Sequence, residues 1–224
     1  MSQRSSMRDR FISPVNYLLL FLVVSICFAQ SFSIARLKYE GGGDWYNDPD
    51  IIPNLARELN TRTNIKSDVT EKVVSLNDDN LFQNPFLFIT GHGNINFSEA
   101  EVKNLRSFLS NGGFIYADDD YGMDEPFRRE MKKVFPDIDF VELPSDHPIY
   151  HMIYDFPNGL PKIHEHYEGA PKGFGLFYQE RMVVFYSWNS NISDGWTDTH
   201  NDPQEKQETA YKMGINIVAY ALTH

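Results

Sequence analysis

Cysteine is nearly absent from this chain of 224 residues, in which Cys27 is the only one. It lies in an N-terminal segment that we expect to be removed, so the mature chain would contain none. This absence excludes a disulfide, a thiolate nucleophile and a zinc–thiolate site from the mature protein. A folded domain must then rely on its hydrophobic core, and the length suffices for one substantial domain.

Positive charge is also scarce. The chain has 20 Lys and Arg against 31 Asp and Glu, and without residues 1–29 it keeps 17 against 30, a net charge of −13. Such a balance argues against nucleic acid and against anionic membrane surfaces as partners. It is compatible with metal ions, cationic ligands or simple solubility.

Long hydrophobic runs are limited to the N-terminus. Arg4, Arg8 and Arg10 precede the mostly apolar segment Val15–Phe28, and Ala29 follows it. A basic region, a short apolar run and small residues together indicate a secretory signal peptide cleaved after Ala29. We therefore expect a periplasmic or extracellular protein that meets the membrane only through this segment. The alternative is an uncleaved anchor, for which the run is short.

The remaining residues, 30–224, predict a single α/β domain. Strand and helix patterns alternate, which favours a mostly parallel sheet in a three-layer α/β/α sandwich. Ser98 and Glu101 have the spacing of a capping box at the start of one helix. We expect strands at 33–39, 73–76, 85–90, 114–117, 139–143, 175–178 and 181–187, and helices at 51–62, 99–111, 125–135 and 204–222.

Three consecutive carboxylates follow one buried strand. Asp118, Asp119 and Asp120 come after the apolar run 114–117 and the glycine pair 112–113. Like charges so close together repel one another unless they are exposed, hydrogen-bonded, protonated or bound to a cation. Strand alternation sends Asp118 and Asp119 to opposite sides of the sheet. One carboxylate, or Asp124 in its place, is expected to cap the following helix.

The other polar loops should meet these carboxylates. In a parallel sheet the loops that follow the strands emerge at one edge, and here they are 40–49, 90–97, 118–124 and 187–202. They carry His92 between two glycines, and Asp194 and His200. Aromatic rings beside carboxylates suit sugar rings or flat polar ligands. The predicted ligand-binding residues are Asp44, Trp45, Tyr46, His92, Asp120, His147 and Trp196.

The long irregular stretch 144–173 is a second place where chemistry could lie. It contains His147 and the pair His164 and His166, whose imidazoles can share one face of an extended segment. A divalent metal near Asp118–Asp120 would need further ligands, which His92, His147 or Asp44 could supply. The sequence leaves the metal, and enzymatic activity itself, open.

Five segments of the chain form a recognisable set: Tyr39–Pro49, Phe86–Gly93, Gly112–Asp119, Phe127–Met131 and Asp146–Ile149. Together they resemble the domain-of-unknown-function 4159 family, over the chain from about Phe32 to its end. The resemblance implies an exported bacterial protein with a flavodoxin-like fold, similar to class I glutamine amidotransferases. In those enzymes a nucleophilic cysteine occupies the elbow that here falls at Asp118–Asp119, so thiol chemistry is excluded.

Three functional hypotheses follow. The first is a domain that binds a polar ligand, a glycan or cell-envelope component, in an open groove lined by Trp45 and Trp196. The second is a hydrolase, with or without a divalent metal, in which the His92 imidazole reaches the Asp118 or Asp119 carboxylate. The third is an interaction module of an envelope complex, which requires a broad exposed apolar patch away from the loops.

Overall fold

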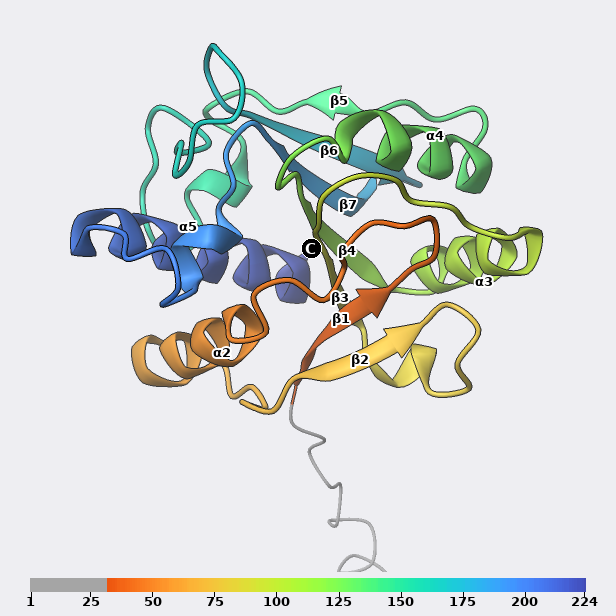
Figure 1. Ribbon diagram of the computed structural model, residues 1–224, viewed down its shortest axis with the longest axis horizontal. Coiled ribbons are helices and arrows are strands. Elements are labelled where there is room, and N and C mark those ends of the chain that lie inside the picture. The colour runs from red at the N-terminus through yellow and green to blue at the C-terminus, as the bar shows by residue number, and fades with distance from the viewer. Residues whose placement is uncertain (1–31) are drawn as a thin grey trace, which may run out of the picture. The chain divides into compact units, whose positions relative to one another are not determined.

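A seven-stranded sheet in the order β2-β1-β3-β4-β7-β6-β5 runs through the domain (Figure 1). The computed structural model describes residues 32–224, so the predicted signal peptide lies outside the described residues. The first five strands in this order are parallel, and β6 and β5 continue the sheet antiparallel. The strands are β1 (Ile34–Lys38), β2 (Lys72–Ser75), β3 (Phe86–Ile89), β4 (Phe114–Asp118), β5 (Val141–Glu142), β6 (Lys172–Tyr178) and β7 (Arg181–Trp188).

Helices cover both faces of the sheet. One hydrophobic core contains residues of α2 (Ile51–Arg62) and α5 (Gln204–Thr223), and a second contains residues of α3 (Glu99–Ser110) and α4 (Asp124–Val134). The predicted α/β class and mostly parallel sheet are thereby confirmed. No helix within residues 32–224 is long and apolar enough to cross a membrane. Three short 3-10 helices complete the fold: η1 (Leu81–Gln83), η2 (Pro148–Tyr150) and η3 (Ser193–Trp196).

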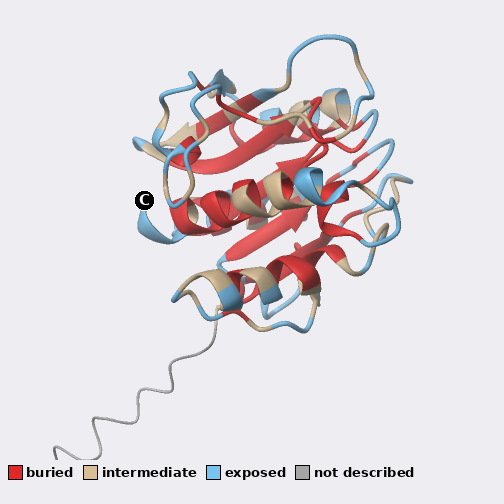
Figure 2. Ribbon diagram, turned by 90° about the vertical axis from the view of Figure 1, so that its left-hand side faces the viewer, coloured by how far each residue is buried: buried red, intermediate tan, exposed pale blue. Residues whose placement is uncertain are grey.

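The central strands β3 and β4 are buried on both faces. Every residue of both is buried, as expected for continuous apolar runs in a parallel sheet (Figure 2). Gly113 precedes β4 where the Phe108 ring leaves no room for a side chain, since an added Cβ would lie 2.3 Å from Cε1 of that ring. The glycine therefore lets α3 pack directly against the start of β4.

Glu130 of α4 is a fully buried carboxylate that supports the loop after β3. Its oxygens accept hydrogen bonds from the Phe97 N–H at 2.9 Å, Lys133 Nζ at 2.6 Å and Arg129 Nε at 2.9 Å. Burial alone would raise the pKa of Glu130, but these three partners outweigh it and hold the pKa below its usual value. Arg129 also donates to the Ile95 carbonyl oxygen, which adds a second bond between α4 and the loop after β3. The loop that carries His92 is thus attached to α4.

Arg36 fixes the loop after β1 in the same way. Its guanidinium is almost fully buried, with an exposed side-chain fraction of 1%. It donates to the carbonyl oxygens of Trp45, Asn47 and Asp48, each at 3.0 Å, and pairs with Glu71. The five donors of Arg in a rigid fork suit such a cluster of acceptors. This one side chain therefore sets the path of the loop that leads to the site.

We predict that Glu130→Gln lowers the free energy of unfolding by about 2–3 kcal/mol at pH 7, because the buried carboxylate that pairs with the exposed Arg129 and Lys133 loses its charge and one acceptor. A folded-state pKa below the usual 4.5 means that the carboxylate stabilises the fold above that pH. This contribution is lost as the pH falls through the lower folded-state pKa, so the two proteins should converge in acid. Urea unfolding from pH 3 to pH 8 measures both effects. The exposed Glu125→Gln on the same helix is the control, and an equal loss there would contradict the prediction.

We also predict that Arg36→Lys destabilises the domain by about 2–4 kcal/mol, because an ammonium group cannot reach all the carbonyl oxygens that Arg36 satisfies. Urea unfolding with a tryptophan fluorescence readout measures the change. The exposed Arg57→Lys on α2 is the matched control, for which a change within about 0.5 kcal/mol is expected. Equal stability of Arg36→Lys and wild type would show that the hydrogen bonds from Arg36 to the three carbonyl oxygens are not needed for stability.

Candidate functional site

The four predicted loops meet at the carboxyl edge of the parallel strands, as hydrogen bonds between them demonstrate. Gly43 donates its N–H to the Asn94 carbonyl oxygen at 3.0 Å, which joins the first two loops. Asn47 Nδ2 donates to Asp120 Oδ2 at 2.6 Å, and Thr199 Oγ1 donates to Asp48 Oδ1 at 3.1 Å. The expected convergence is confirmed.

Asp118 is buried beneath the site. Its oxygens accept hydrogen bonds from the Ser187 hydroxyl and, at 2.6 Å, from the Ser193 N–H. Burial raises the pKa of Asp118 to about 6, against these hydrogen bonds, which lower it. With no exposed surface and two internal partners, Asp118 links β4 to the turn after β7.

Asp119 points the other way, toward α4. Its Oδ1 accepts the Met123 N–H at 3.0 Å, just before that helix begins, and its Oδ2 is buried without a partner. Burial raises the pKa of Asp119 to about 7. The N-cap residue of α4 is Met123, whose side chain makes no capping bond, so the predicted N-cap at one of the three acids or at Asp124 is wrong. Within residues 32–224, His92 makes no hydrogen bond or ion pair with Asp118 or Asp119, which contradicts the hydrolase arrangement predicted from the sequence.

Asp120 is the acid of the three that faces the other loops. Two amides donate to its carboxylate, Asn47 Nδ2 to Oδ2 and, at 3.0 Å, Asn191 Nδ2 to Oδ1. Two imidazoles lie beside it, with His92 Nε2 at 3.2 Å and His166 Nε2 at 3.9 Å. Burial raises the pKa of Asp120 and the nearby Asp194 adds to the rise, while the histidines oppose it.

His92 is held between two carboxylates. Its Nδ1 lies 3.0 Å from Asp44 Oδ2, and its Nε2 faces Asp120. Partial burial alone would lower the pKa of His92, but Asp120 and Asp44 outweigh it and raise this pKa. Gly91 lies before it with φ +133°, where an added Cβ would come within 2.4 Å of the Tyr39 hydroxyl. His92 is half-exposed, so its ring stays open to solvent.

The side-chain amide of Asn191 lies where three acceptor atoms converge. Its Nδ2 is 3.0 Å from Asp120 Oδ1, 2.7 Å from His166 Nε2 and 2.6 Å from Asp194 Oδ2. An NH₂ group has two hydrogens, so it cannot satisfy three acceptors. Its Oδ1 is buried without a partner. Asp120, His166 and Asp194 form a group able to hold a metal ion, and we call these three the first ligand set.

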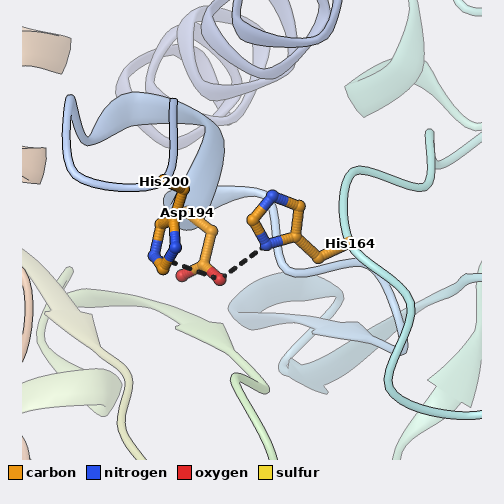
Figure 3. Close-up of side chains that lie close together, drawn as sticks. All are labelled: His164, Asp194 and His200. Carbon is orange, nitrogen blue, oxygen red and sulfur yellow. Dashed lines mark hydrogen bonds and ion pairs between the residues drawn. The ribbon is translucent and has the colours of Figure 1, made fainter. Parts of the chain in front are cut away.

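A second group shares Asp194. His164 Nδ1 lies 2.9 Å from Asp194 Oδ2, and His200 Nε2 lies 3.7 Å from the same oxygen (Figure 3). The other nitrogen of His164, Nε2, is 2.7 Å from Asp202 Oδ2. The bond to Asp194 raises the pKa of His164, partial burial opposes this rise, and Asp202 supports it. We call His164, Asp194 and His200 the second ligand set.

His147, predicted as a ligand, is engaged elsewhere. Its Nδ1 accepts the Ile149 N–H at 3.3 Å and so caps η2. Its ring packs against Phe177 and against Tyr220 near the end of α5. Partial burial lowers the pKa of His147, and the nearby His224 adds to this. The prediction is wrong because the long stretch 144–173 turns only its later part, with His164 and His166, toward the site.

Trp196, also predicted to line the groove, is buried in the core between α2 and α5. Its ring lies 6.0 Å from those of Phe88 and Tyr116. The short helix η3 turns this side chain inward, which a polar loop sequence did not reveal. The groove expected between Trp45 and Trp196 does not exist, since Trp45 packs partly buried against the other core. Tyr46 stacks edge-on against Trp45 and keeps an exposed fraction of 64%.

Other aromatic residues border the first ligand set. Tyr121 packs 5.5 Å from the His166 ring and stacks on Tyr167, which in turn stacks on Trp188. Tyr167 also holds the loop after β4 by accepting the Gly122 N–H at 3.0 Å. A hollow of about 530 Å³ lies beside this stack, lined by Gly93, Asn94, Gly122, Asp124, Glu125, Pro126, Tyr167 and Trp188.

The sequence analysis named His164 and His166 without assigning them to this site, and it did not name Asn191. His164 and His166 had a usable signal, because alternation in an extended segment directs both imidazoles to one face. Asn191 had none, since an asparagine in a polar loop is unremarkable. It adopts φ +55°, a left-handed conformation that asparagine tolerates better than most residues, and this turn directs its amide into the site.

No curated protein matches this chain. A family model described as a domain of unknown function (DUF4159) matches residues 33–222, which is nearly all of the described chain. The resemblance noted in five separate segments therefore extends over the whole domain, and the chain belongs to the DUF4159 family.

Proposed function

We propose that this domain binds a divalent cation through Asp120, His166 and Asp194 and hydrolyses a polar substrate beside it. The observation that carries the proposal is the convergence of three acceptor atoms on the Asn191 amide nitrogen, at 2.6–3.0 Å. Three acceptors around one point favour a positive charge there. Rotation of the amide would bring the unpartnered Oδ1 into the set as a fourth oxygen or nitrogen donor.

The donor types indicate which cation fits. One imidazole with two carboxylates and an amide oxygen suits a first-row transition ion such as Zn²⁺ or Mn²⁺ better than the all-oxygen set that Mg²⁺ or Ca²⁺ prefers. A second unpartnered amide oxygen, Asn47 Oδ1, adjoins the same Asp120 carboxylate. When bound, such a cation supplies Lewis acidity and lowers the pKa of a bound water.

His92 has the position of a general base. It is outside the first ligand set, its Nε2 lies 3.2 Å from Asp120 Oδ2, and its Nδ1 is oriented by Asp44. A cation bound to Asp120 would offset the charge that raises the pKa of His92, and the neutral Nε2 would then accept the proton of an attacking water and return it to the leaving group. The sequence analysis paired His92 with Asp118 or Asp119, and in this proposal Asp120 takes their place as the acid beside it.

The surroundings favour a neutral or cationic substrate. The hollow beside the aromatic stack is lined by Asp124 and Glu125, which would repel phosphate. Stacked Tyr167 and Trp188 rings with nearby carboxylates suit a sugar. We therefore propose an acyl bond, ester or amide, on a glycan or another cell-envelope component. A substrate in the cell envelope agrees with the predicted signal peptide. Export of the chain and an amidotransferase-like fold are parts of this proposal.

The alternative of an interaction module in an envelope complex stays a prediction. Within residues 32–224, the exposed large hydrophobic side chains come from separate elements, such as Val73 of β2, Val141 of β5 and Leu222 of α5. This distribution does not favour one broad apolar patch, whereas the polar groups concentrate at a single edge.

We predict that the full chain, stripped by a chelator, binds Zn²⁺ with a dissociation constant in the micromolar range or below. His166→Ala should weaken binding by about 10–100-fold or more, because it removes a ligand. Isothermal titration calorimetry measures both proteins. His147→Ala is the control, since that histidine caps η2 away from the site. Equal losses in the two variants, or no binding by wild type, would contradict the metal site.

We predict further that the Zn²⁺-loaded chain releases acetate from 4-nitrophenyl acetate or triacetylchitotriose, and that chelation abolishes this. His92→Gln should lower kcat by about 100-fold or more through loss of the base, with the bound metal unchanged. Metal analysis beside the kinetic assay separates the two effects, and His147→Ala should keep wild-type kcat. A His92→Gln variant as fast as wild type would exclude this base.

A further inference from the structure

Asp194 belongs to two groups of metal-ligating side chains. In the first it joins Asp120 and His166, and in the second it joins His164 and His200. The donor atoms of the second set all lie within 4.8 Å of one another. We propose that a second divalent cation binds there, held by His164, Asp194 and His200, so that Asp194 bridges two ions.

The two imidazoles of the second set are directed at one carboxylate from different sides. Their rings are perpendicular, with an interplanar angle of 89° and a centroid distance of 5.1 Å, so they do not stack on each other (Figure 3). His164 Nδ1 and His200 Nε2 lie 2.9 Å and 3.7 Å from Asp194 Oδ2. Each ring thus presents one nitrogen to the same small region.

A supporting carboxylate stands behind His164. Asp202 Oδ2 lies 2.7 Å from His164 Nε2, on the side of the ring away from Asp194. Histidines that bind a metal almost always give their other N–H to a carboxylate, a carbonyl oxygen or water, which fixes the tautomer and the ring orientation. His164 and Asp202 have this arrangement.

The local charge favours a cation. Asp48 Oδ2 lies 3.7 Å from His200 Nε2 and could serve as a further ligand, so Asp48, Asp194 and Asp202 surround the two imidazoles. Lys206 reaches the edge of this group, at 3.6 Å from Asp202 Oδ1. The competing explanation is an ion-pair network in which both histidines are protonated. The two explanations differ in one measurable quantity. If a metal ion binds here, the number of ions per chain falls when these histidines are replaced, whereas an ion-pair network binds no ion.

A bridged pair of ions would extend the proposed reaction. Two cations that share a carboxylate can stabilise the attacking and the leaving oxygen together. The inference rests on the proposed function because Asp194 belongs to both ligand sets. The experiment below, however, assigns each ion to the first or the second ligand set. The first ion and the second ion can therefore be ruled out separately.

The test counts ions per chain. The full chain is stripped with a chelator, dialysed against micromolar Zn²⁺ and analysed by mass spectrometry for zinc. We expect two ions in wild type, one in the His164→Gln/His200→Gln double variant and one in His166→Gln. His151→Gln is the control and should keep two, because His151 also pairs with an aspartate, Asp155, but belongs to neither set.

A crystal soaked in Zn²⁺ and measured at the zinc edge locates the ions without any variant. Two anomalous peaks, one against each ligand set, are expected. A single peak at Asp120 and His166, with one ion in both wild type and the double variant, overturns the second site and leaves the first. A single peak at His164 and His200 overturns the first set instead. No peak at either set overturns both proposals.

Discussion

The hydrogen bonds of Asp118 determine how the candidate site is assembled. The strand β7 pairs with β4 in parallel and sets Ser187 opposite Asp118, although the whole stretch 119–180 separates the two strands in sequence. The buried Asp118 carboxylate strengthens this pairing at its end by accepting from Ser187 of β7, and it extends the connection to the following turn by accepting from the Ser193 N–H. An unmade bond here would leave a buried charge without a partner, which costs more than the bond contributes. The turn is therefore fixed, and Asn191 and Asp194 are fixed with it.

The domain consequently places its charged groups in two different ways. Arg36 and Glu130 are buried and have several hydrogen-bond and ion-pair partners. Through these bonds they hold the loops after β1 and β3 in place. Asp120 and Asp194 are almost as buried, yet their partners are amides and imidazoles rather than arginine or lysine. An amide balances a carboxylate less well than a permanent cation does, and an imidazole is cationic only while it is protonated. The second kind of burial therefore leaves a negative potential at the edge of the sheet, where a ligand can use it.

Sequence reasoning predicted the architecture well because it rests on local periodicity and strand order. It identified the loops and the edge, and it placed His92 and Asp120 among the candidates. It could not choose among three adjacent aspartates, since the choice depends on which side the chain turns after β4. It also placed Trp196 outside, because a 3-10 turn in a polar loop can direct one ring into the core. His147 failed for a similar reason, as no pattern shows where a long irregular stretch changes direction.

The left-handed backbone of Asn191 has a consequence for how freely this position can vary. Two unrelated demands fall on it, since φ is +55° and the amide stands among Asp120, His166 and Asp194. Glycine would satisfy the backbone but remove the amide, and aspartate would tolerate the backbone but add a fourth acceptor to a group already rich in them. Asparagine alone meets both demands. Few residue types can therefore replace asparagine at position 191, although this residue supplies no charge and forms no part of the hydrophobic core.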